Sequence, residues 1–100
     1  MVRHIVMFKL LPFASDEAKQ AKLSEIKEAL EALDGKIDVL RSIRVDFNCN
    51  PAEEYDLILT TEMDTLADVN TYATHPEHVA VSKGIIGPVK AGRACVDYEF

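Results

Sequence analysis

The segment THPEHVAV, residues 74–81, holds two of the chain's three histidines, one on each side of a proline. His75 directly precedes Pro76, His78 follows it by two residues, and Tyr72 lies just upstream. An imidazole can take up or release a proton near neutral pH, and a phenol hydroxyl can donate a hydrogen bond to a developing oxyanion. The segment is therefore a candidate site for proton transfer next to a carbonyl group.

The position of His78 in a helix decides its protonation. A proline disfavours helical dihedrals in the residue before it and suits the first turn of a new helix, so we expect a helix to break near His75 and another to begin at Pro76. The macrodipole at a helix start opposes a positive ring, which favours neutral His78. A neutral ring could serve as a general base; the alternative is a ring bonded only to solvent or backbone.

Two residues upstream of His78, Tyr72 and His75, each allow a structural and a functional interpretation. Tyr72 lies six residues before His78 and could bring its hydroxyl beside the imidazole across the bend. Alternatively, the Tyr72 ring is packed with its hydroxyl at the surface. The His75 ring could cap or close the turn, or it could contribute to a ligand pocket.

His4 lies on the same face of a predicted strand as Val6 and Phe8. A buried imidazole without a partner costs about 1 to 3 kcal/mol, so we expect His4 to form a hydrogen bond. The ring is then either structural or a group that orients a small ligand among apolar side chains. Phe8 and Val79 are apolar residues expected to contribute to the same ligand pocket.

A metal site is not predicted. His75, His78 and Glu77 superficially resemble a set of zinc ligands. However, a helix break separates the two histidines, so they do not share one helix face as in a zinc-binding HExxH motif. Cys49 falls in a polar loop and Cys95 in a strand-like run, and the spacing between the two cysteines is not that of a metal-binding motif. We expect reduced thiols, with a disulfide left open, and no metal or cofactor.

Length and charge restrict the class of protein. The 100 residues make one domain, residues 1–100, and the net charge is −6 with the basic residues scattered, so nucleic acid is not an expected partner. Lys9 interrupts the apolar run at the start of the chain, which is therefore too short for a signal peptide, and no segment is long enough to span a membrane. A cytoplasmic protein with no membrane partner is expected.

Apolar alternation predicts four strands, at residues 2–10, about 37–47, 55–63 and 93–100. Ser15 caps a helix that ends at Gly35 and carries an apolar stripe, and Asp64 or Thr65 caps a second helical region. The stripe consists of Leu23, Ile26, Leu30 and Leu33. The βαββαβ order predicts an α+β, ferredoxin-like fold, with a four-stranded antiparallel sheet and both helices on one face.

The face of the sheet without helices would expose apolar side chains such as Ile5, Met7, Leu40 and Ile58, or their alternates. Withdrawing four of them from water would supply roughly 6 to 12 kcal/mol before the entropy of association is subtracted. We therefore expect a homodimer in which two such faces pack together.

Four segments resemble the Dabb family of stress-responsive dimeric A/B barrel domains: RHIVMFKL, YDLILTTEMDT, TYATHPEHVAV and CVDYEF. The resemblance implies a ferredoxin-like subunit that dimerises sheet to sheet into an α/β barrel, with a pocket between sheet and helices. In its branch of olivetolic acid cyclase-like polyketide cyclases, a Tyr and a His act as orienting group and acid/base in an intramolecular condensation. Those positions match Tyr72 and His78, and His4 and His75 match further histidines. Leu57 stands where the cyclases have another pocket histidine.

Three functions follow as hypotheses. The first is a cofactor-free enzyme in which His78 removes a proton next to a carbonyl group and Tyr72 stabilises the enolate, with His4, His75, Phe8, Leu57 and Val79 around a small apolar or carbonyl-containing ligand. The second is a stress-related, non-catalytic dimer that binds a ligand or has a structural role. The third is a cofactor-free, monooxygenase-like enzyme.

Overall fold

Four strands and three helices follow one another in the predicted βαββαβ order, and the second helical region consists of two helices. The computed structural model describes residues 1–100. The elements are β1 (Val2–Leu10), α1 (Asp16–Glu31), β2 (Ser42–Phe47), β3 (Leu57–Met63), α2 (Leu66–Thr74), α3 (Pro76–Val81) and β4 (Lys90–Glu99). Between α3 and β4 the chain continues through a π-helical turn, Ser82–Ile86, and a 3-10 turn, Gly87–Val89.

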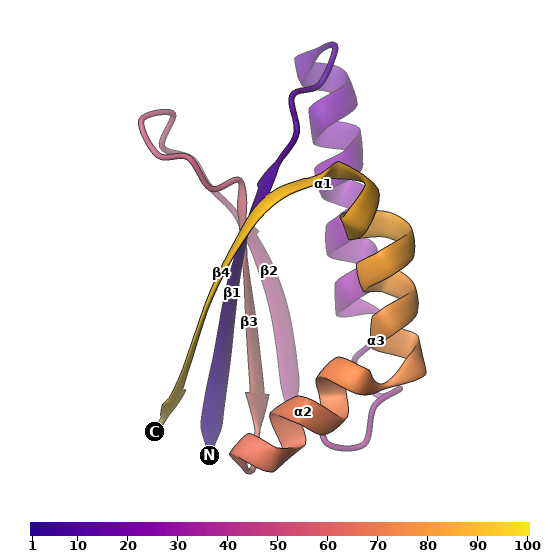
Figure 1. Ribbon diagram of the computed structural model, residues 1–100, viewed down its shortest axis with the longest axis vertical. Coiled ribbons are helices and arrows are strands. Elements are labelled where there is room, and N and C mark those ends of the chain that lie inside the picture. The colour runs from indigo at the N-terminus through magenta and orange to yellow at the C-terminus, as the bar shows by residue number, and fades with distance from the viewer.

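The strands form one antiparallel sheet in the order β2-β3-β1-β4. All three helices lie on the same side of this sheet, and the two chain ends lie close together at one end of it (Figure 1). The ferredoxin-like fold predicted from the sequence is therefore confirmed. No helix has the length and apolar character needed to cross a membrane.

The core fills the space between the sheet and α1. In β1 every second side chain, from Val2 to Leu10, is buried on the helix side. The predicted apolar stripe of α1 packs against them, and Ile26 is fully buried. Alternation with a period of two in the strand and about 3.6 in the helix thus produces one shared apolar layer.

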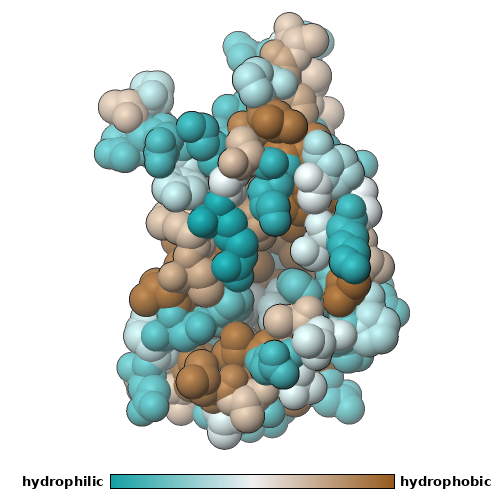
Figure 2. Space-filling model, viewed as in Figure 1, coloured by the Kyte–Doolittle hydropathy of each residue, from teal (hydrophilic) through white to brown (hydrophobic).

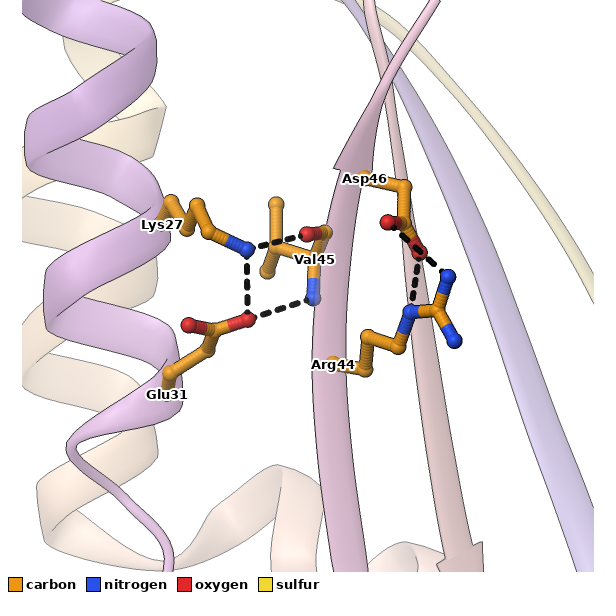
Figure 3. A network of polar contacts seen from close by, with 5 residues as sticks. All are labelled: Lys27, Glu31, Arg44, Val45 and Asp46. Carbon is orange, nitrogen blue, oxygen red and sulfur yellow. Dashed lines mark hydrogen bonds and ion pairs between the residues drawn. The ribbon is translucent and has the colours of Figure 1, made fainter.

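Side chains of α1 also satisfy the outer edge of the sheet (Figure 3). β2 is an edge strand, so its outward backbone groups have no strand partner. The Glu31 carboxylate accepts a hydrogen bond from the Val45 N–H at 3.0 Å, and the Lys27 ammonium donates one to the Val45 carbonyl oxygen at 2.6 Å. Lys27 and Glu31 also pair with each other at 2.8 Å. This edge is closed to a further strand at Val45.

The prediction of a strand over residues 37–41 is wrong. The second strand begins at Ser42, and Ile37 and Leu40 are both buried in the turn that follows α1. The Leu40 N–H donates to the Ile37 carbonyl oxygen at 3.0 Å, a turn bond that places both side chains on the core side. Gly35 makes the reversal possible with a φ of 82°. Leu40 therefore does not belong to the uncovered face.

The other strand boundaries shift by a few residues. β3 begins at Leu57 instead of residue 55, and β4 begins at Lys90 and ends at Glu99.

The face of the sheet opposite the helices carries exposed apolar side chains, as predicted. The strand register places Ile5 between Thr60 of β3 and Val96 of β4 on this face, which we call the uncovered face. Val96 is 57% exposed, and Phe100 at the end of the chain is 54% exposed. Figure 2 shows brown, apolar side chains among teal ones along the left edge of the molecule, where Figure 1 places this side of the sheet.

Candidate active site

The break between α2 and α3 positions the predicted site. His75 ends α2 in an extended conformation, with φ −64° and ψ 135°, and Pro76 opens α3. The His75 Nδ1 accepts a hydrogen bond from the Glu77 N–H at 3.1 Å. The structure therefore places the His75 ring as the cap of α3, one of the two roles considered from the sequence.

His78 is held with one ring nitrogen bonded and the other free to react. Its Nδ1 lies 2.9 Å from the Ala73 carbonyl oxygen, and because a carbonyl can only accept, Nδ1 carries the hydrogen. Burial lowers the pKa of His78, and the bond to Ala73 only partly opposes this effect. The ring is therefore neutral at neutral pH with a lone pair on Nε2, which is the form a general base requires.

Tyr72 packs directly against His78. Their ring centroids are 4.5 Å apart with planes inclined by 52°, and Tyr72 is fully buried. Its hydroxyl is the one buried side-chain polar atom without a hydrogen-bond partner within the protein. Burial raises the pKa of Tyr72 far above its ordinary value, so the hydroxyl stays protonated and remains a donor. An unpaired buried donor is costly in stability and is typical of a functional position.

His4 forms the hydrogen bond that its burial requires. Its Nδ1 contacts the carboxylate of Asp97, and the Cys95 sulfur lies 3.5 Å from the same nitrogen. The His4 ring meets Tyr72 edge-on, with centroids 6.2 Å apart. His4, Tyr72 and His78 thus form a continuous row of rings between the sheet and the bend of the helices.

A cavity of about 90 Å³ lies beside this row. It is lined by His4, Val6, Phe8, Leu59, Ala73, His78, Ser82, Lys90 and Arg93. One water requires roughly 10 to 15 Å³ of such space, so the cavity has room for several waters or for a small compound. Five of its nine lining residues are polar or charged, so the cavity is more polar than the pocket predicted from the sequence.

The structure brings some of the predicted site residues together and separates others. His4, Phe8 and His78 line the cavity, whereas Tyr72 packs against His78 without lining it. Val79 is half-buried in α3 and, like His75, is not part of the lining. Leu57 is buried beside Phe8 in the sheet but lines a separate groove of about 460 Å³ on the β2–β3 side, together with Met7, Phe47, Asn48, Glu53, Tyr55 and Ile58.

Three polar lining residues were missed by the sequence analysis: Ser82, Lys90 and Arg93. Arg93 is the one arginine of the chain without a carboxylate partner, because the other three are ion-paired. After burial, positive charge nearby, including that of Arg93, also contributes to the low pKa of His78. Strand alternation could have placed Arg93 on the same face as Cys95 and Asp97, but the sequence alone does not show that β4 pairs with β1 at His4.

Residues 2–100 match the Stress responsive A/B Barrel Domain, Dabb. The chain belongs to the Dabb family. A comparison with curated proteins found no significant match. Membership confirms the resemblance seen in the sequence over nearly the whole length of this Dabb domain, and it describes a fold more closely than a reaction.

Solved structures with the same fold have different descriptions. A dimeric protein of unknown function with a ferredoxin-like fold, from Bacteroides fragilis, is 52% identical, with a TM-score of 0.90 over 99% of this chain and 95% of that one. A hydroxynitrile lyase from Passiflora edulis is 16% identical, with a TM-score of 0.77 over 97% and 90%. A candidate antibiotic biosynthesis monooxygenase from Nitrosomonas europaea is 12% identical, with a TM-score of 0.75 over 100% and 98%. At such low identities the last two show the shared fold alone.

Proposed function

We propose that this Dabb domain is a cofactor-free enzyme that moves a proton next to the carbonyl group of a small substrate. The observation that carries the proposal is a neutral, backbone-anchored His78 at the wall of a cavity, packed against Tyr72, whose buried hydroxyl has no partner. His78 Nε2 removes the proton from the carbon, and the electron pair moves to the carbonyl oxygen. The Tyr72 hydroxyl donates to that oxygen as its negative charge develops.

The Nδ1 contact of His78 with Ala73 supports this division of roles. With Nδ1–H fixed on the carbonyl, only Nε2 can accept the proton, and the positive charge formed is stabilised by the same backbone oxygen. Tyr72 does not line the cavity, so its hydroxyl reaches the substrate only after a small rotation of the His78 ring or of its own side chain. A donor that lacks a partner loses no existing hydrogen bond in that movement.

The cavity restricts the substrate class. Its volume of about 90 Å³ is well below the roughly 300 to 1,000 Å³ of pockets for drug-sized ligands, so a long polyketide chain does not fit as the cavity stands. The free guanidinium of Arg93 and the ammonium of Lys90 suit a substrate that also carries a carboxylate. A short oxo acid combines the carbonyl, the acidic C–H and the charge that these residues recognise.

The test compares solvent hydrogen exchange in short oxo acids, followed by NMR, for the wild type, His78→Ala and Tyr72→Phe. We expect wild-type catalysis of exchange at the carbon next to the carbonyl, and loss of about 100- to 10,000-fold in His78→Ala. Arg93→Gln should raise KM more than it lowers kcat, because Arg93 binds the substrate without taking part in proton transfer. Equal exchange rates in the wild type and His78→Ala would contradict the proposal.

The small cavity also favours a second candidate, a dimer that binds a small ligand without turning it over. In that case oxo acids or other small compounds would raise the unfolding temperature of the wild type while no exchange occurs. His78→Ala would then weaken binding and leave dimerisation and stability largely unchanged. If His78→Ala unfolds the protein instead, the histidine has a structural role and both candidates lose their central residue.

We also infer that the uncovered face packs against a second copy of the chain. The apolar side chains of β1, β3 and β4 on this face have no helix to cover them, and the Bacteroides fragilis protein, 52% identical, is described as dimeric. Light scattering at micromolar concentration should give twice the mass of one chain, and a stable monomer would contradict this inference.

A further inference from the structure

Three potential metal ligands converge where β1 and β4 pair. The register aligns His4 with Asp97 and Val6 with Cys95, and alternation turns His4, Cys95 and Asp97 to the same face of the sheet. One nitrogen, one sulfur and one carboxylate oxygen from these residues lie within 4.8 Å of one another. His4 is buried, whereas Cys95 and Asp97 are exposed, so the cluster is open to solvent on one side.

The geometry of the cluster does not suit a proton relay from thiol to carboxylate. In a Cys-His-Asp relay, the thiol and the carboxylate bond to opposite nitrogens of the imidazole. Here Asp97 and Cys95 both approach Nδ1 of His4. Three donor atoms gathered within 4.8 Å of one another, instead of forming a chain, suit binding to a single ion.

We propose that His4, Cys95 and Asp97 bind one divalent transition-metal ion of the zinc type. Thiolate, imidazole and carboxylate are ligands that zinc accepts together, and three protein ligands leave a fourth position open to water or a small molecule. Zn–N bonds of about 2.0 to 2.1 Å and a Zn–S bond of about 2.3 Å at tetrahedral angles put nitrogen and sulfur about 3.5 Å apart. The separation between His4 Nδ1 and Cys95 Sγ is 3.5 Å.

Asp97 must move for the ion to enter. Its carboxylate contacts Nδ1 directly, whereas tetrahedral zinc would hold the oxygen and nitrogen about 3.4 Å apart. The Asp97 side chain is 31% exposed and belongs to an edge strand, so it can turn outward without disturbing the core. The ion then takes the place of the hydrogen now shared by His4 and Asp97.

The charges balance around such an ion. One thiolate and one carboxylate neutralise the two positive charges, and the imidazole binds in its neutral form. On binding, the His4 hydrogen moves from Nδ1 to Nε2 and the Cys95 thiol releases its proton to solvent, so one proton is released per ion. Arg93, two residues before Cys95 on the same strand face, opposes the ion and limits its affinity.

The set differs from the combination of His75, His78 and Glu77 considered in the sequence. Its ligands are separated by 91 and 93 positions along the chain, so only strand pairing brings them together. The inference does not depend on the proposed proton-transfer activity. It would, however, make the fourth ligand position a neighbour of the cavity, because His4 lines that cavity.

The test uses the whole chain, freed of metal and kept reduced, titrated with Co²⁺ and followed by absorption. We expect a thiolate-to-cobalt charge-transfer band in the near ultraviolet that saturates at one ion per chain and disappears when Zn²⁺ is added. Cys95→Ser should abolish the band, and Asp97→Asn should weaken binding by about 10- to 100-fold or more, as loss of even a supporting residue does at other metal sites. The matched control is Cys49→Ser, which removes the other exposed thiol and should leave the band unchanged.

A second measurement guards against misfolded variants. Zn²⁺ should raise the unfolding temperature of the wild type and of Cys49→Ser, but not that of Cys95→Ser, while circular dichroism shows all three folded. No saturable band in the wild type would overturn the proposal, as would a band that survives in Cys95→Ser and is lost in Cys49→Ser.

Discussion

The two faces of the sheet are built from the same strands but surrounded very differently. On the helix side, alternate residues of β1 and β3 are buried at 8% exposure or less. On the other side, the intervening residues of β1 and β3 stay partly exposed, and Val96 and Tyr98 of β4 are 57% and 42% exposed. The strands thus place apolar side chains on both faces, while the chain supplies helices to cover only one.

This difference shows which face of the sheet has all of its packing partners within one chain. The covered face has its partner within the chain, and the polar groups buried in it, His4 and Thr61, are hydrogen-bonded. The Tyr72 hydroxyl is the exception and lies next to the candidate base. The uncovered face has no partner within the chain, which is why we assign it to a second copy.

The largest expected effect comes from placing a charge on the uncovered face. Ile5→Asp puts one carboxylate per chain at the centre of this face, and in a symmetric dimer each buried, unpaired charge costs about 3 to 5 kcal/mol. Sedimentation at micromolar concentration should then show monomers. Gln20→Asp adds the same charge on the exposed side of α1 and should leave the dimer intact. Dimers of unchanged affinity in Ile5→Asp would place the interface elsewhere.

A core truncation should follow in size. Ile26→Ala removes a fully buried side chain of α1, and the lost contacts together with the cavity left behind should lower the free energy of unfolding by about 2 to 5 kcal/mol. Urea unfolding measures this change. Leu66→Ala, at a position that is 62% exposed, should change stability by about 0.5 kcal/mol or less. Similar losses in both variants would mean that α1 does not form the core described here.

The same contrast explains what could be predicted from the sequence. Strand alternation, the Ser15 and Thr65 caps and the proline break at Pro76 are local signals, and each appears in the structure. The end of the first helical region was harder. Ile37, Val39 and Ile43 recur with a period of two, which is typical of a strand, but tertiary burial holds Ile37 and Leu40 in a turn.

The candidate site could be predicted only in part for a similar reason. His78 and Tyr72 are close in sequence, so the bend between them was visible. Asp97 contacts His4, and Arg93 lines the same cavity, only because β4 pairs antiparallel with β1. The register of that pairing depends on contacts across the whole sheet. The Tyr72 hydroxyl lacks a partner because of packing, which no local pattern shows.

Removing the Tyr72 hydroxyl should stabilise the covered face. An unsatisfied buried polar group costs about 1 to 3 kcal/mol, so Tyr72→Phe should raise the free energy of unfolding by an amount in this range while abolishing the donor to the substrate oxygen. Tyr98→Phe is the control, because that hydroxyl already accepts a hydrogen bond from Arg3 at 2.8 Å, so its loss should not stabilise the protein. Thermal and urea unfolding measure both. A destabilised Tyr72→Phe would show that the hydroxyl already has a partner in solution.

The smallest expected effect is a pH dependence at His78. Because burial holds the pKa of His78 below its ordinary value, the unfolded chain binds this proton more readily than the folded one. The stability contributed by neutral His78 is therefore complete above the unfolded pKa of about 6.5 and is lost as pH falls below it towards the folded pKa.

The carboxylates with lowered pKa values, Glu31, Glu62 and Asp64, act in a more acidic range, so the two effects separate. In urea unfolding between about pH 5 and 7.5, His78→Gln should give a flatter dependence of stability on pH than the wild type. Parallel curves would mean that the ring is hydrated as freely in the folded chain as in the unfolded one, and the general-base role would then lose the buried environment that keeps His78 neutral.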